Sequence, residues 1–303
     1  MSRIRLVGLD GTNPLDFLAA LGLLRVVPGA KLGFSNDGSF QAFVEGLDHS
    51  EANLAALIAN DAQASAEPNG VWRFTYEKAA TKKQEAKPVA DLKPAPGDFK
   101  TFLVTSVNAW VAGNEEMAAY AAAYATDVAV DGKGNIKPTA FHFTAAQQTF
   151  LGAVDGIRST VTEEWIKQSL FEGQGERPGS NLRWDPGADR NWALMATNPS
   201  DAGTRVDAPI EWLAFRGLPL LPSFPRGKRI MTTAVAGHAD DTTFTWPLWM
   251  VPASCHTVRS LLQVDWRQRT QEGRARGVFA ICTSAIRRSG QGFGNFGPSA
   301  MTS

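Results

Sequence analysis

Residues 13–26 read NPLDFLAALGLLRV, and this segment predicts a helix that is buried on every side. Asn13 is suited to cap the helix, Pro14 to fill its first position, and Asp16 to lie near the exposed amides of the first turn. Almost every later position is apolar, so the helix has no polar face to turn toward solvent. Pro28 ends it. Such a helix needs other elements packed around its whole surface.

The sequence on either side of this helix predicts both strands and helices. Periodicity and turn residues predict a strand over 3–8, a hairpin over 34–44, a helix over 50–60 and a strand over 71–76. Residues 78–98 contain five Lys and three Pro, and they predict a mobile loop or linker.

The middle of the chain is predicted to be helical and the last third irregular. Helices are expected from Asn114 to about residue 126, from Thr144, and from the capping box that joins Thr160 to Glu163. Beyond residue 180 the expected elements are strands and rigid turns over 217–222 and 244–249, a helix over 254–269 and a loosely held Gly-rich tail over 289–303. The sequence therefore predicts an α+β fold, with a mixed α/β domain over 1–110 and a helical and Arg-rich region over 111–303.

The composition excludes several classes of protein. A chain of 303 residues with 44% hydrophobic residues can bury a full core, so global disorder is excluded. Two cysteines supply neither a disulfide framework nor a four-Cys zinc site. No stretch resembles a signal peptide, and the longest apolar segment, residues 15–24, is about half the length that spans a bilayer. We expect a soluble cytoplasmic protein with no membrane partner.

Motifs that would carry an enzymatic reaction are weak. Residues 292–297 match G-x-G-x-x-G, but too few residues follow for the helix that a dinucleotide site requires, so we expect a flexible tail with Phe293 and Phe296 as anchors. Cys282 lies in an apolar run and is expected to be a buried, inert thiol. The chain contains neither a nucleophile elbow nor a Walker lysine motif.

Two groups of metal-ligating residue types lie close together in the sequence. Cys255 precedes His256, and His238 is followed by Asp240 and Asp241, but neither group has the spacing of a metal site. We therefore expect no catalytic residue, no cofactor and no metal. A metal-dependent hydrolase at His238, Asp240 and Asp241 is kept as the least favoured alternative.

The charge distribution is the stronger signal. Residues 205–303 hold 12 of the 30 basic side chains and only 6 of the 30 acidic ones, and 11 of those 12 are Arg. The guanidinium group forks onto phosphate oxygens and guanine edges, which favours a nucleic-acid surface. The predicted nucleic-acid-binding residues are Arg226, Lys228, Arg229, Arg259, Gln263, Arg267, Arg269, Arg274, Arg276, Arg287 and Arg288, with Lys82 and Lys83 adding nonspecific attraction.

Three details accompany this prediction. Arg259, Gln263 and Arg267 lie four residues apart and are expected to share one face of the helix over 254–269. Gln263 or Gln291 is a candidate for contacts to base edges. Most tryptophans of the last third are expected in the core, with one or two available to stack on bases. The alternative is a solvated basic face, or one paired with acidic protein.

Five passages resemble a known family. These are residues 9–25, 182–186, 192–194, 217–222 and 244–249, which read LDGTNPLDFLAALGLLR, LRWDP, WAL, GLPLLP and FTWPLW. They are similar to segments of the large subunit of type I CRISPR surveillance complexes (Cascade) of subtype I-G, formerly I-U. They cover some forty residues, and none is a catalytic motif.

The resemblance implies a non-catalytic subunit of an antiviral ribonucleoprotein. Such subunits lie at the 5′ end of the crRNA beside other Cascade subunits, read the protospacer-adjacent motif in target double-stranded DNA, support R-loop formation and recruit a helicase-nuclease. Sequence reading is otherwise left to the guide RNA. The chain is short for a large subunit and lacks an evident C-terminal helical bundle, so the alternative is an accessory, protein-interaction subunit of the same locus without direct DNA binding.

Overall fold

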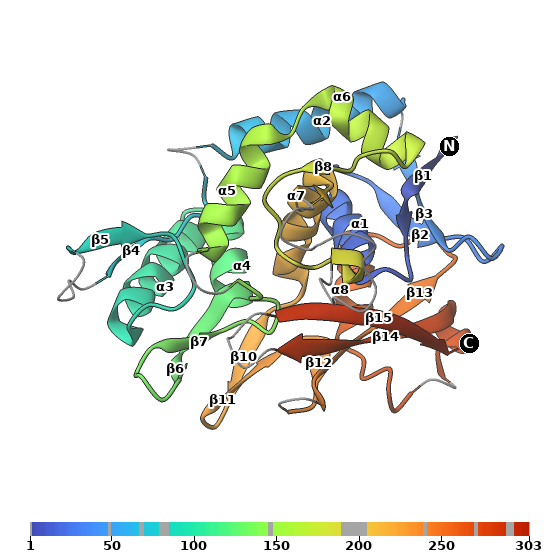
Figure 1. The fold of residues 1–303 in the computed structure, drawn as a ribbon. Coiled ribbons are helices and arrows are strands. Elements are labelled where there is room, and N and C mark those ends of the chain that lie inside the picture. Colours follow the sequence, from blue (N-terminus) through green and yellow to red (C-terminus); the bar gives the residue numbers. More distant parts are fainter. Residues whose placement is uncertain are drawn as a thin grey trace, which may run out of the picture.

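The computed structural model describes residues 2–47, 50–66, 70–78, 85–144, 148–188, 205–238, 241–269, 272–288 and 294–302. Helices and strands are mixed along this part of the chain, so the predicted α+β class is confirmed. Figure 1 shows two central helices, α1 and α7, with a group of helices on one side and most of the strands on the other.

Two antiparallel sheets lie beside the central helices. The first has the order β1-β3-β2 and consists of β1 (Ser2–Asp10), β2 (Lys31–Phe34) and β3 (Gln41–Leu47). The second has the order β12-β13-β14-β15 and consists of β12 (Val235–Ala236), β13 (Thr243–Trp249), β14 (Val278–Arg288) and β15 (Gly294–Thr302). Leu32 and Ala253 exchange two backbone hydrogen bonds of 3.0 and 2.8 Å, which connect the two regions.

Helix α1 (Pro14–Val26) is the buried helix that the sequence predicts. The Asn13 side chain accepts a hydrogen bond from the Leu15 amide at 2.9 Å, so the expected cap is present. The Phe17 ring lies 5.9 Å from the Phe34 ring of the first sheet and 5.6 Å from the Trp246 ring of the second. One side chain thus joins the helix to both sheets.

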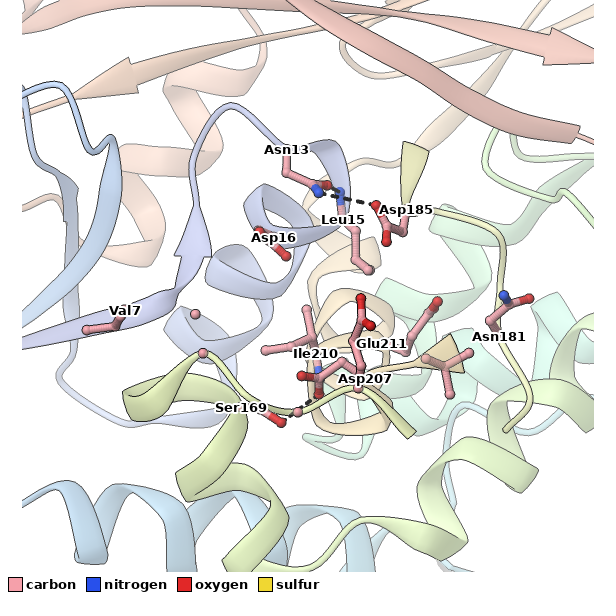
Figure 2. A pocket seen from close by; sticks show the side chains of 15 residues that line it. Val7, Asn13, Leu15, Asp16, Ser169, Asn181, Asp185, Asp207, Ile210 and Glu211 are labelled. Atoms are coloured by element: carbon pink, nitrogen blue, oxygen red, sulfur yellow. Dashed lines mark hydrogen bonds between the residues drawn. The ribbon is translucent and has the colours of Figure 1, made fainter. Parts of the chain in front are cut away.

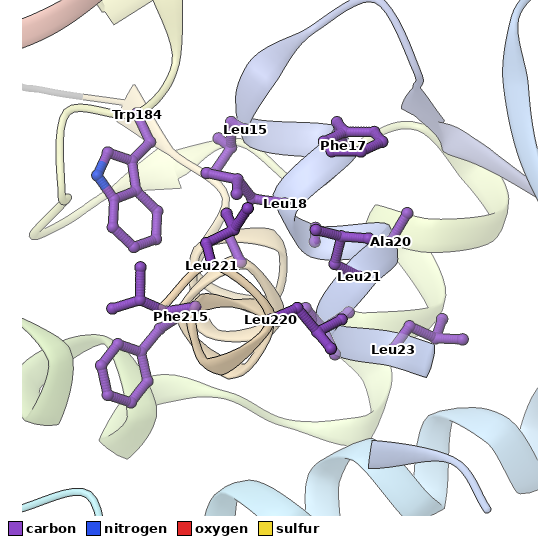
Figure 3. Packing of buried hydrophobic residues seen from close by; sticks show 14 of the residues in the cluster. Leu15, Phe17, Leu18, Ala20, Leu21, Leu23, Trp184, Phe215, Leu220 and Leu221 are labelled. Atoms are coloured by element: carbon purple, nitrogen blue, oxygen red, sulfur yellow. The ribbon is translucent and has the colours of Figure 1, made fainter. Parts of the chain in front are cut away.

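Helix α7 (Ala208–Gly217) crosses α1 at very short range, as Figure 3 shows from close by. A Cβ atom added to Gly22 would lie 1.7 Å from the Leu213 carbonyl oxygen, and one added to Gly217 would lie 2.4 Å from the Leu18 carbonyl oxygen. Only glycine has room at these two positions, because backbone meets backbone there.

The other helices surround this pair. They are α2 (Glu51–Ala64), α3 (Pro96–Val111), α4 (Glu115–Tyr124), α5 (Phe150–Thr160), α6 (Glu163–Lys167) with a following π-helical turn η1 (Gln168–Glu172), and α8 (Cys255–Leu262), besides the 3₁₀ turns η2 (Pro186–Ala188), η4 (Leu218–Leu220) and η7 (Arg274–Arg276). Each of α2, α4, α6 and α8 begins after a capping side chain, from Ser50, Asn114, Thr162 and Ser254.

Four short two-stranded antiparallel pairings complete the described structure. They are β4 (Tyr76–Lys78) with β5 (Lys87–Val89), β6 (Ala125–Val130) with β7 (Ile136–Pro138), β8 (Arg177–Pro178) with β9 (Arg205–Val206), and β10 (Ser223–Arg226) with β11 (Arg229–Thr232).

A single apolar cluster runs from Ile4 to Phe296. Trp184, Trp212, Trp246, Trp249 and Trp266 are all buried in it, which confirms that most tryptophans of the last third belong to the core. The indole N–H of each of these five tryptophans donates to an oxygen within 3.1 Å. Trp192 lies outside the described residues.

Several predicted elements are wrong in their extent. Residues 71–72 form a turn and the strand begins only at Tyr76, because the Trp72 indole donates to the Ser65 carbonyl and anchors the turn. The helix expected from Thr144 begins at Phe150. In the segment expected as a mobile loop, residues 87–89 pair with β4 and α3 starts at Pro96.

The last third contains three further corrections. Residues 217–222 form no strand, because Gly217 ends α7 and Leu218–Leu220 continue as a 3₁₀ turn. The helix over 254–269 ends at Leu262. The tail is not loose: Gly294–Thr302 pairs with β14, and Phe296 is fully buried. Phe293 lies outside the described residues.

Two other expectations concern single features. Cys282 is buried, and burial raises the pKa of its thiol to about 12, which agrees with an inert thiol. Among the residues that the structure describes, no helix is long and apolar enough to cross a membrane.

Candidate nucleic-acid interface

A groove of about 1030 Å³ lies where two hairpins meet the end of β14 and the segment after α8. Figure 1 shows the two hairpins, β6–β7 and β10–β11, projecting side by side from one edge of the molecule. Among the described residues, six cationic side chains and two acids, Asp131 and Asp265, line the groove, so this part of its lining has an excess of four positive charges. The six cations are Lys93, Lys137, Arg226, Arg229, Arg267 and Arg288. We call this feature the cationic groove.

The β10–β11 hairpin carries the most exposed of these cations. Arg226 and Arg229 are register partners on either side of the turn, where Gly227 has a φ of 60° that favours glycine. In the part of the chain that the structure describes, neither guanidinium group has an ion-pair partner. Both positive charges are therefore available to a ligand.

Hydrogen bonds hold the two hairpins together at the base of the groove. The Ala140 amide donates to the Thr232 hydroxyl at 3.0 Å, and the Thr139 hydroxyl lies 3.5 Å from the same oxygen. The Lys137 ammonium donates to the Lys228 carbonyl at 3.3 Å. These contacts fix the hairpin tip relative to the rest of the groove.

Arg288 and Arg267 approach the groove from the other side. Arg288, at the end of β14, donates to the Ala140 carbonyl at 2.9 Å and to the His142 carbonyl at 3.2 Å. Carbonyl oxygens orient this guanidinium group without cancelling its charge. Arg267 instead forms a two-pronged pair with Asp265, with both N–O distances at 3.0 Å, so its charge is largely offset.

A buried His–Asp pair lies beneath the groove. The Nε2 atom of His142 lies 2.9 Å from Asp91 Oδ1, which also accepts from the Phe150 amide at 3.1 Å. Burial raises the pKa of Asp91, but the hydrogen bonds from His142 and Phe150 outweigh it and leave that pKa lowered. Burial lowers the pKa of His142 in spite of Asp91. The imidazole is thus neutral near pH 7, and the positive charge of the groove comes from Lys and Arg.

The structure brings together four of the predicted residues, one or two from each Arg cluster in the sequence: Arg226, Arg229, Arg267 and Arg288. Lys228 lies exposed at the tip of the β10–β11 hairpin, next to the groove. Lys82, Lys83 and Gln291 lie outside the described residues.

The other predicted residues do not line the groove. Arg259 lies on α8, but Gln263 only caps that helix and Arg267 follows it, so the three do not share a helix face as predicted. Arg269 and Arg276 both pair with Glu272, at 3.5 and 3.2 Å. Arg274 lies exposed in η7, and the Arg287 side chain lies close to Gly297 on the neighbouring strand.

The charge argument missed the groove cation Lys137, which stands apart from the Arg clusters in the sequence. Lys93 belongs to the Lys-rich segment 78–98, of which only Lys82 and Lys83 were singled out. Turn residues around Asp131 favour the β6–β7 turn, but they do not show that this hairpin lies against β10–β11.

The described residues include part of the alternative hydrolase site. His238 lines the groove, whereas Asp240 lies outside the described residues. Within the described residues, no group of three or more His, Cys, Asp or Glu is arranged to hold a metal ion. A comparison of the chain with family models, curated proteins and solved structures finds no match.

Proposed function

We propose that this protein binds double-stranded nucleic acid along the cationic groove. The observation that supports it is the convergence of Arg226 and Arg229, Arg267, and Arg288, which lie more than twenty residues apart in the sequence as three groups. Cations from distant segments on one surface form the electrostatic footprint of a polyanion site.

The lining of the groove favours a duplex backbone over a single strand. No Phe, Tyr or Trp lines it in the part of the chain that the structure describes, and single-strand sites depend on aromatic rings on which bases stack. Phosphates on a duplex need only cations and N–H donors. The hairpin tip at residues 226–229 is a narrow two-stranded ribbon, an element that the major groove admits.

The resemblance to the large subunit of subtype I-G CRISPR surveillance complexes suggests the setting. In that setting the duplex is target DNA, the hairpin tip is the candidate reader of the protospacer-adjacent motif, and the protein supports R-loop formation as a non-catalytic subunit. The other partners are the crRNA-containing complex and the helicase-nuclease.

Binding of a fluorescent DNA duplex, measured by anisotropy at several salt concentrations, tests the proposal. If the groove neutralises about four phosphates, log affinity falls against log salt with a slope of about −4. The double variant Arg226→Gln, Arg229→Gln is expected to weaken binding and to make that slope less steep by about 2.

The matched control is Arg259→Gln, Arg274→Gln, which removes two exposed cations that do not line the groove. This control should bind like the unchanged protein. A slope near zero, or equal losses in both double variants, would contradict the proposal.

A second candidate is a protein-interaction subunit, favoured by an exposed apolar face on α3. Val104, Val107, Trp110 and Val111 are each more than half exposed on that helix. In that case nuclease treatment leaves the complex intact when partners are captured together with this chain, and the groove variants bind duplex as well as the control does.

A further inference from the structure

The first sheet has a second face, opposite the core, and a hollow of about 400 Å³ lies on it. Along β1 the side chains alternate: Ile4 and Leu6 belong to the core cluster, whereas Arg3 and Arg5 are exposed. The hollow is lined by these two arginines, by Phe43 of β3, by part of the turn between β2 and β3, and by the segment after β13. We call this feature the sheet hollow.

Phe43 is buried on this face without belonging to the core. Its neighbours Ala42 and Val44 are in the core cluster, but Phe43, at 3% exposure, is not. A Cβ atom added to Gly33 on β2 would lie 2.5 Å from a carbon of the Phe43 ring, so the ring lies against the backbone of that strand. The Arg3 guanidinium lies over the ring, with its central carbon 3.9 Å from the ring centroid. Arg3 therefore shields Phe43 from solvent.

The Arg3 guanidinium is held in place and is still accessible. Its Nε atom donates to Glu45 Oε1 at 2.8 Å, and the side chain is 50% exposed. Phe43 takes one side of the planar group, so the exposed part faces away from the ring. A supported guanidinium plane is a platform on which a flat aromatic ligand, such as a nucleobase, stacks.

Arg5 supplies a positive charge beside this platform. It is the register partner of Phe43 across β1 and β3, which places the two side chains on the same face of the sheet. Arg5 is exposed, and its guanidinium group has no ion-pair partner within the described residues. Phosphate oxygens are the acceptors that the guanidinium fork fits best.

The two acids nearest to the hollow already have hydrogen-bond donors. Glu45 pairs with Arg3, and Asp37 in the turn between β2 and β3 accepts from the Ser39 amide at 3.0 Å and from its hydroxyl at 2.6 Å. Arg5 is thus the cation of the hollow that is left for an anionic ligand. Asn36 and Gln41 add side-chain amides to the lining, and such groups can hydrogen-bond to base edges.

The sheet hollow and the cationic groove offer different contacts to a nucleic acid. The groove offers several cations and, in the described part of the chain, no aromatic ring. The hollow offers a stacking platform and one unpaired cation. Bases of a duplex are already stacked and paired, so a platform is of use only to an unpaired base. The hollow therefore fits a single strand.

The two features lie at opposite ends of β13. Thr242, directly before this strand, lines the cationic groove, and Met250, directly after it, lines the sheet hollow. An extended segment of this length spans about 26 Å. The groove and the hollow share no lining residue. Each can therefore be altered without touching the other.

We propose that the sheet hollow binds one nucleotide of a single-stranded nucleic acid. The base stacks on the exposed side of the Arg3 guanidinium, and the phosphate pairs with Arg5. This binding is independent of the cationic groove and of whether the groove binds a duplex.

Anisotropy of fluorescent single-stranded oligoadenylates of about eight nucleotides, one RNA and one DNA, tests the proposal. The full chain carries Arg226→Gln and Arg229→Gln, so that the cationic groove contributes little. One neutralised phosphate gives a slope of log affinity against log salt of about −0.7, compared with about −4 for a duplex in the groove. Binding of either oligoadenylate supports the proposal, and the difference between the two shows whether the 2′-hydroxyl contributes.

Two variants in the hollow separate the phosphate contact from the stacking contact. Arg5→Gln should weaken single-strand binding about tenfold and bring the salt slope close to zero. Arg3→Lys keeps the charge but removes the plane, so it should weaken binding at least fivefold while the slope remains. In the chain with the groove intact, neither change should alter the affinity for a duplex.

The matched control is Arg274→Gln, which removes an exposed cation outside the hollow. This control should bind the oligoadenylates as the parent chain does. Three results would overturn the proposal: no binding of either oligoadenylate at low salt, equal losses in Arg5→Gln and in the control, or unchanged binding in Arg3→Lys. Loss of duplex binding in the groove variants alone would leave single-strand binding in place.

Discussion

The two ends of α7 both carry buried charge, and among the described residues the ion pairs lie at its carboxyl end. At the carboxyl end, Arg216 contacts Asp61 at 2.9 Å, Glu116 at 2.7 Å and the Tyr120 hydroxyl at 2.7 Å. Arg25 of α1 also contacts Glu116 at 2.6 Å. At the amino end, Asp207 and Glu211 face a hollow between α1 and α7 that no cation lines among the described residues (Figure 2).

This difference separates charge paired with opposite charge from charge held by hydrogen bonds alone within the described residues. The Arg216 network joins α1, α2, α4 and α7 through ion pairs. At the other end, burial and then the neighbouring acids raise the pKa values of Asp16 and Glu211, each of which accepts one backbone hydrogen bond.

The largest expected effect comes from breaking the paired end. Arg216→Met should lower the free energy of unfolding by about 3–5 kcal/mol, since it removes the Arg partner of the buried Asp61 carboxylate and leaves Glu116 with Arg25 alone. Urea denaturation at pH 7 measures this change. Burial already raises the pKa of Asp61, so the loss should shrink at pH 4, where that carboxyl is protonated in the variant. A loss below about 1 kcal/mol would show that the pairing is not structural.

An intermediate effect is expected from Glu211→Gln, and it depends on pH. The pKa of Glu211 is raised from 4.5 to about 8 in the folded chain, so the folded state binds more protons than the unfolded state between these values. Stability due to this group is present below pH 4.5 and is lost as pH rises toward 8. Relative to the variant, wild-type protein should therefore lose up to about 1.4 kcal/mol per pH unit over that range.

Urea denaturation of both proteins at pH 5, 6, 7 and 8 checks this sign. A difference that does not change with pH would mean that Glu211 is ionised in the folded state throughout the range.

The smallest effect is expected at Asp207, where two substitutions can separate the role of the side chain as a helix cap from the role of its negative charge. Asp207→Ala should lower the free energy of unfolding by about 0.5–2 kcal/mol, because the Ile210 amide and the Ser169 hydroxyl lose their acceptor. Asp207→Asn retains an acceptor oxygen and should lie within about 0.5 kcal/mol of the unchanged protein. Equal losses in the two variants, from thermal or urea denaturation, would assign the role to the negative charge.

Local signals in the sequence predicted where helices begin better than they predicted which residues share a surface. Asn13, Pro14 and an unbroken apolar run were enough for α1, because helix capping and burial depend on neighbouring residues. The helix expected over 254–269 failed at Leu262 because a turn anchored by the buried Trp266 follows it, and periodicity alone does not reveal that contact.

The candidate nucleic-acid interface was predictable only in part, because it depends on contacts between segments that are distant in the sequence. An excess of Arg is visible in the sequence, but its arrangement depends on which hairpins lie together. Register placed Arg226 beside Arg229, whereas Lys137 joins them only because Ala140 and Thr232 hold the two hairpins in contact. No sequence signal singled out the hollow between the amino-terminal ends of α1 and α7, because its lining residues Asp16, Asp185 and Glu211 come from three distant segments.

The glycine contact between α1 and α7 has a consequence for molecular recognition. Gly22 and Gly217 leave no side-chain layer between the two helices, so one cannot slide or rotate against the other without backbone atoms colliding. The amino-terminal turns that carry Asp16 and Glu211 are therefore held at a fixed distance from each other. Any ligand that bound between these two turns would have to match that distance, so its length, more than its charge alone, would decide whether it fits.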